Sequence, residues 1–293
     1  MFDPPLLLIA VFVGAFGACI GSFLNVCIYR IPREESVVRP RSHCPHCQAL
    51  IPWYLNLPVL SWLLLRGRCN FCRGPISPRY LLVELLTAVL FLLVLFQLPE
   101  YPRWLGMLRQ DEWLRIPVYF VFIGGLILGT FVDFEFMEIP DQVTLGGTAA
   151  GLIFSILVPA LHGHGALQDA SAFWHRSLFS LGHAALAAAI GAGSLWVVGW
   201  LGEKAFQKEA MGLGDVKLMG AVGAFLGWQA VLFTIVGGAL LGSVVGVTLI
   251  LCRRVKMQGH IPFGPYLSLA ALVWIYWGPL LWQSYLRLMS APN

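Results

Sequence analysis

Long apolar stretches are the feature that most limits what this chain can fold into. Seven stretches near the roughly 20 residues that a helix needs to cross a bilayer lie at 6–29, 80–98, 116–132, 142–161, 177–201, 229–251 and 262–282. A shorter one, 216–227, counts as a short or tilted span. Only 12% of the residues are charged, against about 25% in a typical soluble domain. The chain is therefore predicted to be an all-α integral membrane protein with about eight transmembrane helices.

Basic residues predict the orientation of these spans, because cytoplasmic loops carry an excess of Lys and Arg. If the loop after the first span lies inside, all but five of the 19 Lys and Arg residues lie in inside segments. The five outside are Arg103, Arg109, Arg115, Arg176 and Arg287. Both termini then lie outside, which requires the short span. The first span has no basic residues before it and no clear cleavage site, so we expect a retained helix.

The polar segment 30–79 carries two C-x2-C pairs that predict a metal site. Cys44 and Cys47 form the first pair, and Cys69 and Cys72 form the second, with 21 residues between the pairs. Two such turns can direct four thiolates at one tetrahedral ion. The alternative is two disulfides or unused thiols, but the predicted cytoplasmic side is reducing. We expect one structural zinc ion, with a neighbouring histidine as a possible substitute ligand. The candidates for that substitution are His43 and His46.

Three aspartates stand at the ends of predicted spans, where ionisable groups are costly and usually functional. Asp133 follows the span 116–132, Asp141 precedes the span 142–161, and Asp215 precedes the short span. In the predicted topology all three lie at the inner face. Two carboxylates brought close together share one proton, so one can act as a base while the other acts as an acid. The pattern predicts a protease dyad at this face.

The residues around these aspartates have structural interpretations as well. A carboxylate at a helix start can simply accept backbone N–H bonds, and Lys217 can extend its ammonium group to the interface. Glu84, inside the second span, can be a structural partner for a polar group. Gly212 and Gly214 are expected to remove side-chain bulk beside Asp215 and to permit a turn with positive φ.

Six stretches in this order resemble the signatures of the type IV prepilin peptidases, a family of bifunctional leader peptidases and N-methyltransferases. They are GSFLNVCIYRIP at 21–32, the double C-x2-C at 44–72, RYLLVELLT at 79–87, DFEFMEIPD at 133–141, GLGDVKL at 212–218 and IPFGPY at 261–266. Any one of these stretches is a weak signal. Together they cover nearly the whole chain, and their joint specificity is high.

This resemblance implies a GxGD aspartic protease of the bacterial inner membrane. The family's catalytic pair matches Asp133 and Asp215 in this sequence, whereas Asp141 matches a third aspartate that is not usually counted as catalytic. The positions expected to support the site are Gly212, Gly214, Asp141 and Lys217. The implied division of the chain is a first helix at 1–29, a zinc loop at 30–79 and a protease bundle at 80–293.

The resemblance also implies the substrates and a second reaction. Prepilins and pseudopilins have a short basic leader, a glycine before the cut, then usually phenylalanine and a long apolar helix. After cleavage the new N-terminal amine is methylated by S-adenosylmethionine, and intact zinc cysteines fit this bifunctional branch. The sequence has no strand followed by G-x-G-x-x-G and a helix, so no cofactor site can be assigned. The resemblance places it near the first-span signature and the zinc loop, and Glu84 is a candidate contributor.

The sequence also bears on other partners and on other functions. We expect the arginine-rich loop to meet anionic lipid head groups rather than a basic leader, and we expect no nucleic-acid partner. The stretch 162–176 is longer than is common in the family and is interpreted as a tolerated insertion. The alternatives are a peptidase without methyltransferase activity that cuts another membrane substrate, a cation or proton transporter using the aspartates as a relay, and a scaffold that docks a partner on its zinc loop.

Overall fold

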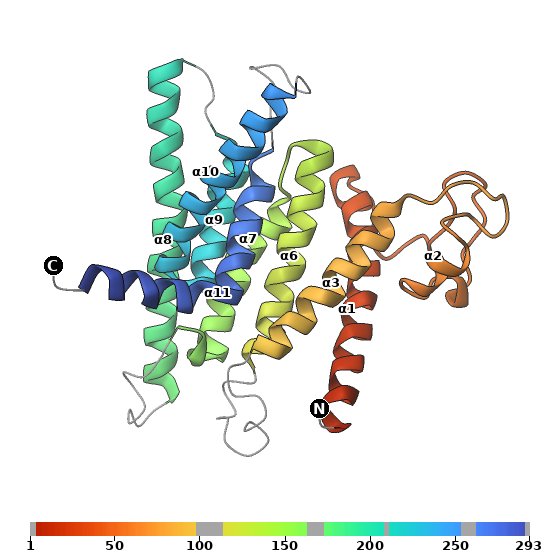
Figure 1. Ribbon diagram of the computed structural model, residues 1–293, viewed down its shortest axis with the longest axis horizontal. Helices are drawn as coiled ribbons and strands as arrows, with labels where there is room; N and C mark the ends of the chain where they lie inside the picture. The colour runs from red at the N-terminus through yellow and green to blue at the C-terminus, as the bar shows by residue number, and fades with distance from the viewer. Residues whose placement is uncertain (1–3, 98–113, 163–172, 208–210, 253–261, 291–293) are drawn as a thin grey trace. The chain divides into compact units, whose positions relative to one another are not determined.

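The computed structural model describes residues 4–97, 114–162, 173–207, 211–252 and 262–290 (Figure 1). Within these ranges the chain is helical, and its only extended pairings are two isolated bridges in the loop after α1. The helices are α1 (Pro4–Arg30), α2 (Leu60–Leu64), α3 (Pro78–Gln97), α6 (Arg115–Phe136), α7 (Asp141–Leu157), α8 (Phe173–Phe206), α9 (Leu213–Leu226), α10 (Trp228–Leu251) and α11 (Gly264–Ser290). The all-α prediction is confirmed for these residues.

Six of the described helices are long and apolar enough to cross a membrane: α1, α3, α6, α8, α10 and α11. The chain is thus a multi-pass membrane protein. The other two predicted spans form the shorter helices α7, with 17 residues, and α9, with 14 residues. Several basic residues used for the orientation, and the first residue of the last signature, lie outside the described residues: Arg103, Arg109, Lys208, Arg253, Arg254, Lys256 and Ile261.

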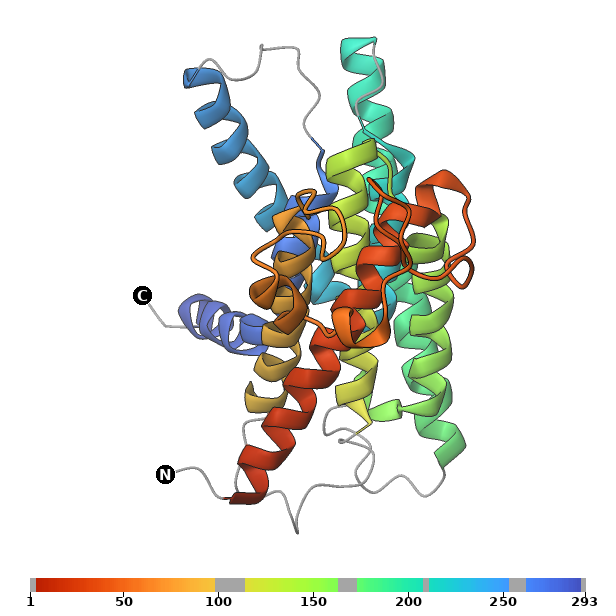
Figure 2. The same ribbon diagram turned by 90° about the vertical axis from the view of Figure 1, so that its right-hand side faces the viewer.

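The chain divides into two compact units, Met1–Trp104 and Leu105–Asn293. In the first unit, α1 and α3 lie side by side, as both views show (Figures 1 and 2). Glycines allow this close packing, since a Cβ on Gly21 would lie 2.7 Å from the Cα of Glu84. The Asn25 side chain donates a hydrogen bond of 3.0 Å to the Tyr80 carbonyl. The functional division at 29 and 79 stays a prediction.

In the second unit, α9 is packed among α7, α8 and α10. Residues 218–225 of α9 are all buried, as expected for a helix that is apolar on every side. Two glycines bring its backbone against α8, because Gly223 lies against the Ala187 carbonyl and Gly191 of α8 lies against the Met219 carbonyl. α11 contains Pro279 and bends, as Figure 1 shows, which is the expected effect of an internal proline.

Candidate functional site

Asp133 lies in the last turn of α6 and is buried, with 5% of its surface exposed. Its Oδ2 accepts a hydrogen bond of 3.1 Å from the backbone N–H of Gly264, the first residue of α11. A Cβ on Gly264 would lie 2.7 Å from that same oxygen. Position 264 therefore has to be glycine for α11 to start against this carboxylate.

Asp215 is the third residue of α9, and the helix is capped by Gly212. The backbone N–H of Asp215 donates to the Gly212 carbonyl at 3.2 Å, so Asp215 itself is not the capping residue. The expected positive φ is wrong at Gly212, where φ is −69° and the backbone is extended. Gly214 is already helical and has no positive φ either. An N-cap adopts extended backbone by its nature, so no left-handed turn is needed.

Three glycines near the aspartates lie against Ile139, a buried residue of the turn between α6 and α7. A Cβ on Gly214 would lie 3.4 Å from the Ile139 Cβ. A Cβ on Gly129 of α6 would lie 3.3 Å from Ile139 Cγ2, and a Cβ on Gly264 would lie 2.8 Å from Ile139 Cδ1. Three helices thus present glycine to one side chain. A Cβ on Gly212 would lie 3.6 Å from Asp215 Oδ2, which is an ordinary contact, so the removal of bulk beside Asp215 stays a prediction.

The two aspartates of the predicted dyad interact electrostatically with each other. Asp141 is engaged elsewhere, because its Oδ1 accepts a bond of 2.7 Å from the Lys217 ammonium group and one of 3.4 Å from the Thr144 hydroxyl. Its side chain is 60% exposed, in contrast to the buried Asp133. The structure therefore separates the three aspartates into an interacting pair and one residue bound to a lysine.

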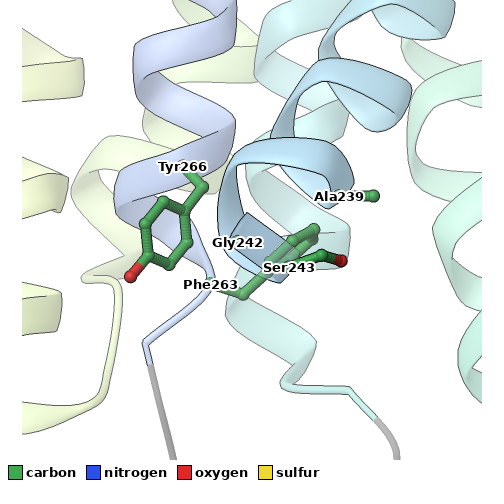
Figure 3. A pocket seen from close by; sticks show the side chains of 5 residues that line it. All are labelled: Ala239, Gly242, Ser243, Phe263 and Tyr266. Carbon is green, nitrogen blue, oxygen red and sulfur yellow. The ribbon is translucent and has the colours of Figure 1, made fainter. Parts of the chain in front are cut away.

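A cavity of about 300 Å³ lies between α10 and the start of α11 (Figure 3). It is lined by Ala239, Gly242, Ser243, Phe263 and Tyr266. Phe263 directly precedes the glycine that donates to Asp133, so the cavity is close to one carboxylate of the pair. Sequence reasoning did not single out Gly264 or Ile139 for a role in the site, although Gly264 lies in IPFGPY and Ile139 lies in DFEFMEIPD.

The four loop cysteines come together as predicted and form one candidate metal centre. Their Sγ atoms all lie within 4.8 Å of one another, and those of Cys44 and Cys72 are 3.9 Å apart. A tetrahedral zinc ion with Zn–S bonds of about 2.3 Å needs sulfur atoms about 3.8 Å apart. None of the seven cysteines, all of which lie in described residues, forms a disulfide. The residues fit a structural zinc ion, and no histidine belongs to the cluster.

The two halves of this centre repeat one backbone motif with an offset of 25 residues. The N–H of Cys44 donates to the Ala49 carbonyl, and the N–H of Cys69 donates to the equivalent Gly74 carbonyl. Isolated bridges join His43 to Leu50 and Arg68 to Pro75. Backbone N–H groups of the second half, those of Cys72 and Phe71, lower the pKa of the Cys69 thiol to about 6. A thiolate is the form that binds metal.

Glu84 lies in the first unit and is buried against the same loop. Its Oε2 accepts a bond of 2.7 Å from the backbone N–H of Val59, and the Ser22 side chain also hydrogen-bonds the carboxylate. Glu84 therefore has a structural role, which was one of the two roles predicted for it. Of the polar stretch 162–176, the structure describes His162 and 173–176.

Comparisons with known proteins identify the family. Residues 15–98 match the bacterial peptidase A24 N-terminal domain, and residues 120–247 match the type IV leader peptidase family. A prepilin leader peptidase/N-methyltransferase of Aeromonas hydrophila is 37% identical over 92% of this chain and 91% of its own length. A protein of the same name from Pseudomonas putida is 33% identical over 94% of this chain and 92% of its own length. One from Myxococcus xanthus is 38% identical over 83% of this chain and 64% of its own length. No solved structure gives a significant match. The chain belongs to the type IV leader peptidase family.

Proposed function

We propose that this protein removes the basic leader from prepilins and pseudopilins with an aspartate dyad and then methylates the new N-terminus. The observation that carries the proposal is the placement of Asp133 in the last turn of α6 and of Asp215 in the first turn of α9, near enough for the charge of Asp133 to act on Asp215. The names of the relatives, prepilin leader peptidase/N-methyltransferase, support both reactions.

The cleavage step follows from the chemistry of two interacting carboxylates. One aspartate, ionised, takes a proton from a water molecule, which attacks the scissile carbonyl carbon. The other, protonated, donates to the carbonyl oxygen and the proton passes on to the leaving amine as the C–N bond breaks. The Gly264 N–H holds Asp133 in place by its bond to Oδ2. Ile139, wedged between three glycines, keeps the turn that follows Asp133 against α9 and α11.

The methyl group of the second reaction comes from S-adenosylmethionine. The described residues contain no strand followed by a glycine-rich turn and a helix, so they do not fit a Rossmann-type cofactor site. Glu84 remains the proposed contributor from the first unit, although its carboxylate already accepts the Val59 N–H.

The placement in the cell is part of the same proposal. α7 and α9 would complete eight spans in the bacterial inner membrane, with the zinc loop and the dyad at the cytoplasmic face. Asp133 at the end of α6 and Asp215 at the start of α9 then share one membrane depth. A substrate whose leader stays in the cytoplasm and whose apolar helix stays in the bilayer would be cut at that depth. The alternatives of a transporter or a scaffold have no support from the relatives' names.

The experiment that tests the proposal uses purified protein in liposomes with a prepilin that carries its leader. Mass spectrometry follows loss of the leader and gain of one methyl group. We expect wild type to do both, and we expect Asp133→Asn and Asp215→Asn each to lose at least about 100-fold in cleavage rate, the usual worth of a positioned acid or base. Glu138→Gln, which changes an exposed carboxylate of the turn after α6, is the control and should cleave. Cleavage by both dyad variants would overturn the assignment, whereas cleavage without methylation would leave a peptidase only.

A further inference from the structure

One face of α2, in the loop that follows α1, is apolar and exposed. Leu60, Leu63 and Leu64 are 57%, 53% and 82% exposed, and their i, i+3, i+4 spacing places them on the same side of the helix. Trp53 and Tyr54, in the turn before α2, are 74% and 56% exposed. We call these five side chains the apolar face of the loop. An exposed cluster of this kind usually marks a contact with a membrane or a protein.

The remaining side of α2 is packed inwards, so the exposure of the leucines is not a sign of a loose helix. Trp62 donates from its indole Nε1 to the Ile76 carbonyl at 3.4 Å. Its ring lies against Gly67, whose φ of +66° only glycine adopts easily and where a Cβ would be 2.8 Å from the ring. The helix is thus fixed in its orientation, with one face on the loop and the leucines pointing away.

A hydrogen bond between Val59 and Glu84 ties the start of α2 to α3. Val59 immediately precedes α2, and its backbone N lies 2.7 Å from Glu84 Oε2. Glu84 is six residues into α3, or about 9 Å along the helix axis, and a helical side chain points back towards the N-terminus of its helix. α3 is long and apolar enough to span a membrane. The start of α2 is therefore held beside the N-terminal turns of a spanning helix, which is where such a helix meets the bilayer surface.

The charge of the loop matches one kind of bilayer surface. Residues 30–79 contain eight arginines, two glutamates and neither lysine nor aspartate. Arg66 and Arg68 lie within four residues of the end of α2 and are exposed. Clusters of basic residues beside a spanning helix attract anionic lipid head groups, while tryptophan and tyrosine favour the boundary between head groups and acyl chains.

We propose that the apolar face of the loop inserts into the cytoplasmic leaflet and that Arg66 and Arg68 bind anionic phospholipid head groups, so that the zinc loop is seated on the membrane. The three leucines then enter the acyl boundary, as the apolar side of an interfacial helix does. Seated in this way, the loop is held at two places: by Glu84 inside α3 and by lipid around α2. The proposal does not depend on either reaction of the protein.

The test places the photoreactive amino acid p-benzoylphenylalanine at position 64 of the full-length protein in phosphatidylcholine vesicles containing phosphatidylglycerol. Position 50 is the matched control, because Leu50 is an exposed leucine of the same loop, 61% exposed, in the first metal knuckle. After irradiation, mass spectrometry identifies what is attached. We expect phospholipid adducts at position 64 to exceed those at position 50 several-fold. Peptide adducts at 64, or equal lipid adducts at both positions, would overturn the proposal.

A second arm tests the head-group part. Phosphatidylglycerol should raise the lipid adduct at position 64 above that in pure phosphatidylcholine, and Arg66→Gln with Arg68→Gln should remove this increase, about fivefold for each arginine. Arg287→Gln, which removes an exposed arginine of α11, is the control. An increase that survives the double substitution would exclude these arginines as the head-group site. Equal zinc content in all variants shows that the loop is folded.

Discussion

Ile139 shows how closely single residues determine the geometry of the aspartate site. It is 5% exposed and meets glycines of α6, α9 and α11. Its neighbours across these contacts include the N–H donor of Asp133 and the residue before Asp215. A side chain at these glycine positions would meet Ile139 at different distances, so its effect on catalysis should follow the space available at each position.

The same substitution is therefore expected to act differently at two glycines. A Cβ at Gly214 would be in ordinary contact with Ile139, at 3.4 Å, whereas a Cβ at Gly264 would lie 2.7 Å from Asp133 Oδ2 and 2.8 Å from Ile139 Cδ1. We expect Gly214→Ala to keep most of the cleavage activity. Gly264→Ala should lower kcat/KM at least about tenfold, because overpacking of a tight site costs 1–3 kcal/mol. Kinetics on a prepilin substrate would check this, and equal losses at the two positions would contradict it.

At the scale of elements, α9 depends on a residue from another segment. Ala224 lies in the last turn of α9, where carbonyls have no partner within the helix. The Nε2 of His162 hydrogen-bonds this carbonyl at 2.9 Å. Burial lowers the pKa of His162 to about 4, so the ring stays neutral in the folded protein over most of the acid range. A carbonyl at the C-terminal end of the helix that begins with the GxGD turn is thus hydrogen-bonded to an uncharged imidazole.

A pH dependence of stability follows from this bond. The unfolded chain takes up a proton on His162 near pH 6.5, and the folded protein does so only near pH 4. The contribution of the neutral His162 to the free energy of unfolding is therefore complete above pH 6.5 and is lost as the pH falls towards 4. Over that window we expect wild type to lose about 1–3 kcal/mol more unfolding free energy than His162→Gln, which keeps a donor but does not titrate. Parallel slopes for both proteins in acid unfolding experiments would contradict the role of His162.

The helices were predictable because each one has to be apolar over its own length. All eight predicted spans form helices, with ends that differ by up to eight residues, as for 262–282 against Gly264–Ser290. The cysteine cluster was predictable because its ligands sit in two short, regular motifs. The bonds from Gly264 to Asp133 and from Val59 to Glu84 join residues far apart in sequence. Hydropathy and spacing carry no information about such partners, which only tertiary packing brings together.

At the scale of the whole molecule, the two compact units carry different chemistry. The cysteine cluster and Glu84 lie in Met1–Trp104, while both aspartates lie in Leu105–Asn293. The aspartates are held by contacts within their own unit, namely the Gly264 N–H at Asp133 and the Gly212 carbonyl at the Asp215 backbone. A protein that both cuts and methylates could therefore lose one reaction without losing the other.

Loss of the metal should separate the two reactions. Cys69→Ser with Cys72→Ser removes one half of the ligand set, and we expect the zinc content to fall from one ion to near zero, because two thiolates do not complete a tetrahedral site. The loop should then unfold, since structural zinc supplies folding energy. Cleavage should be retained, because the described hydrogen-bond partners of the aspartates lie in their own unit. Methylation should be lost, because intact zinc cysteines are what fits the bifunctional branch of the family. Metal analysis and mass spectrometry of the product measure both effects.

Cys19→Ser, outside the cluster, is the control. A zinc-free variant that methylates at the wild-type rate, or that cuts as poorly as Asp133→Asn, would show that the reactions are not divided in this way.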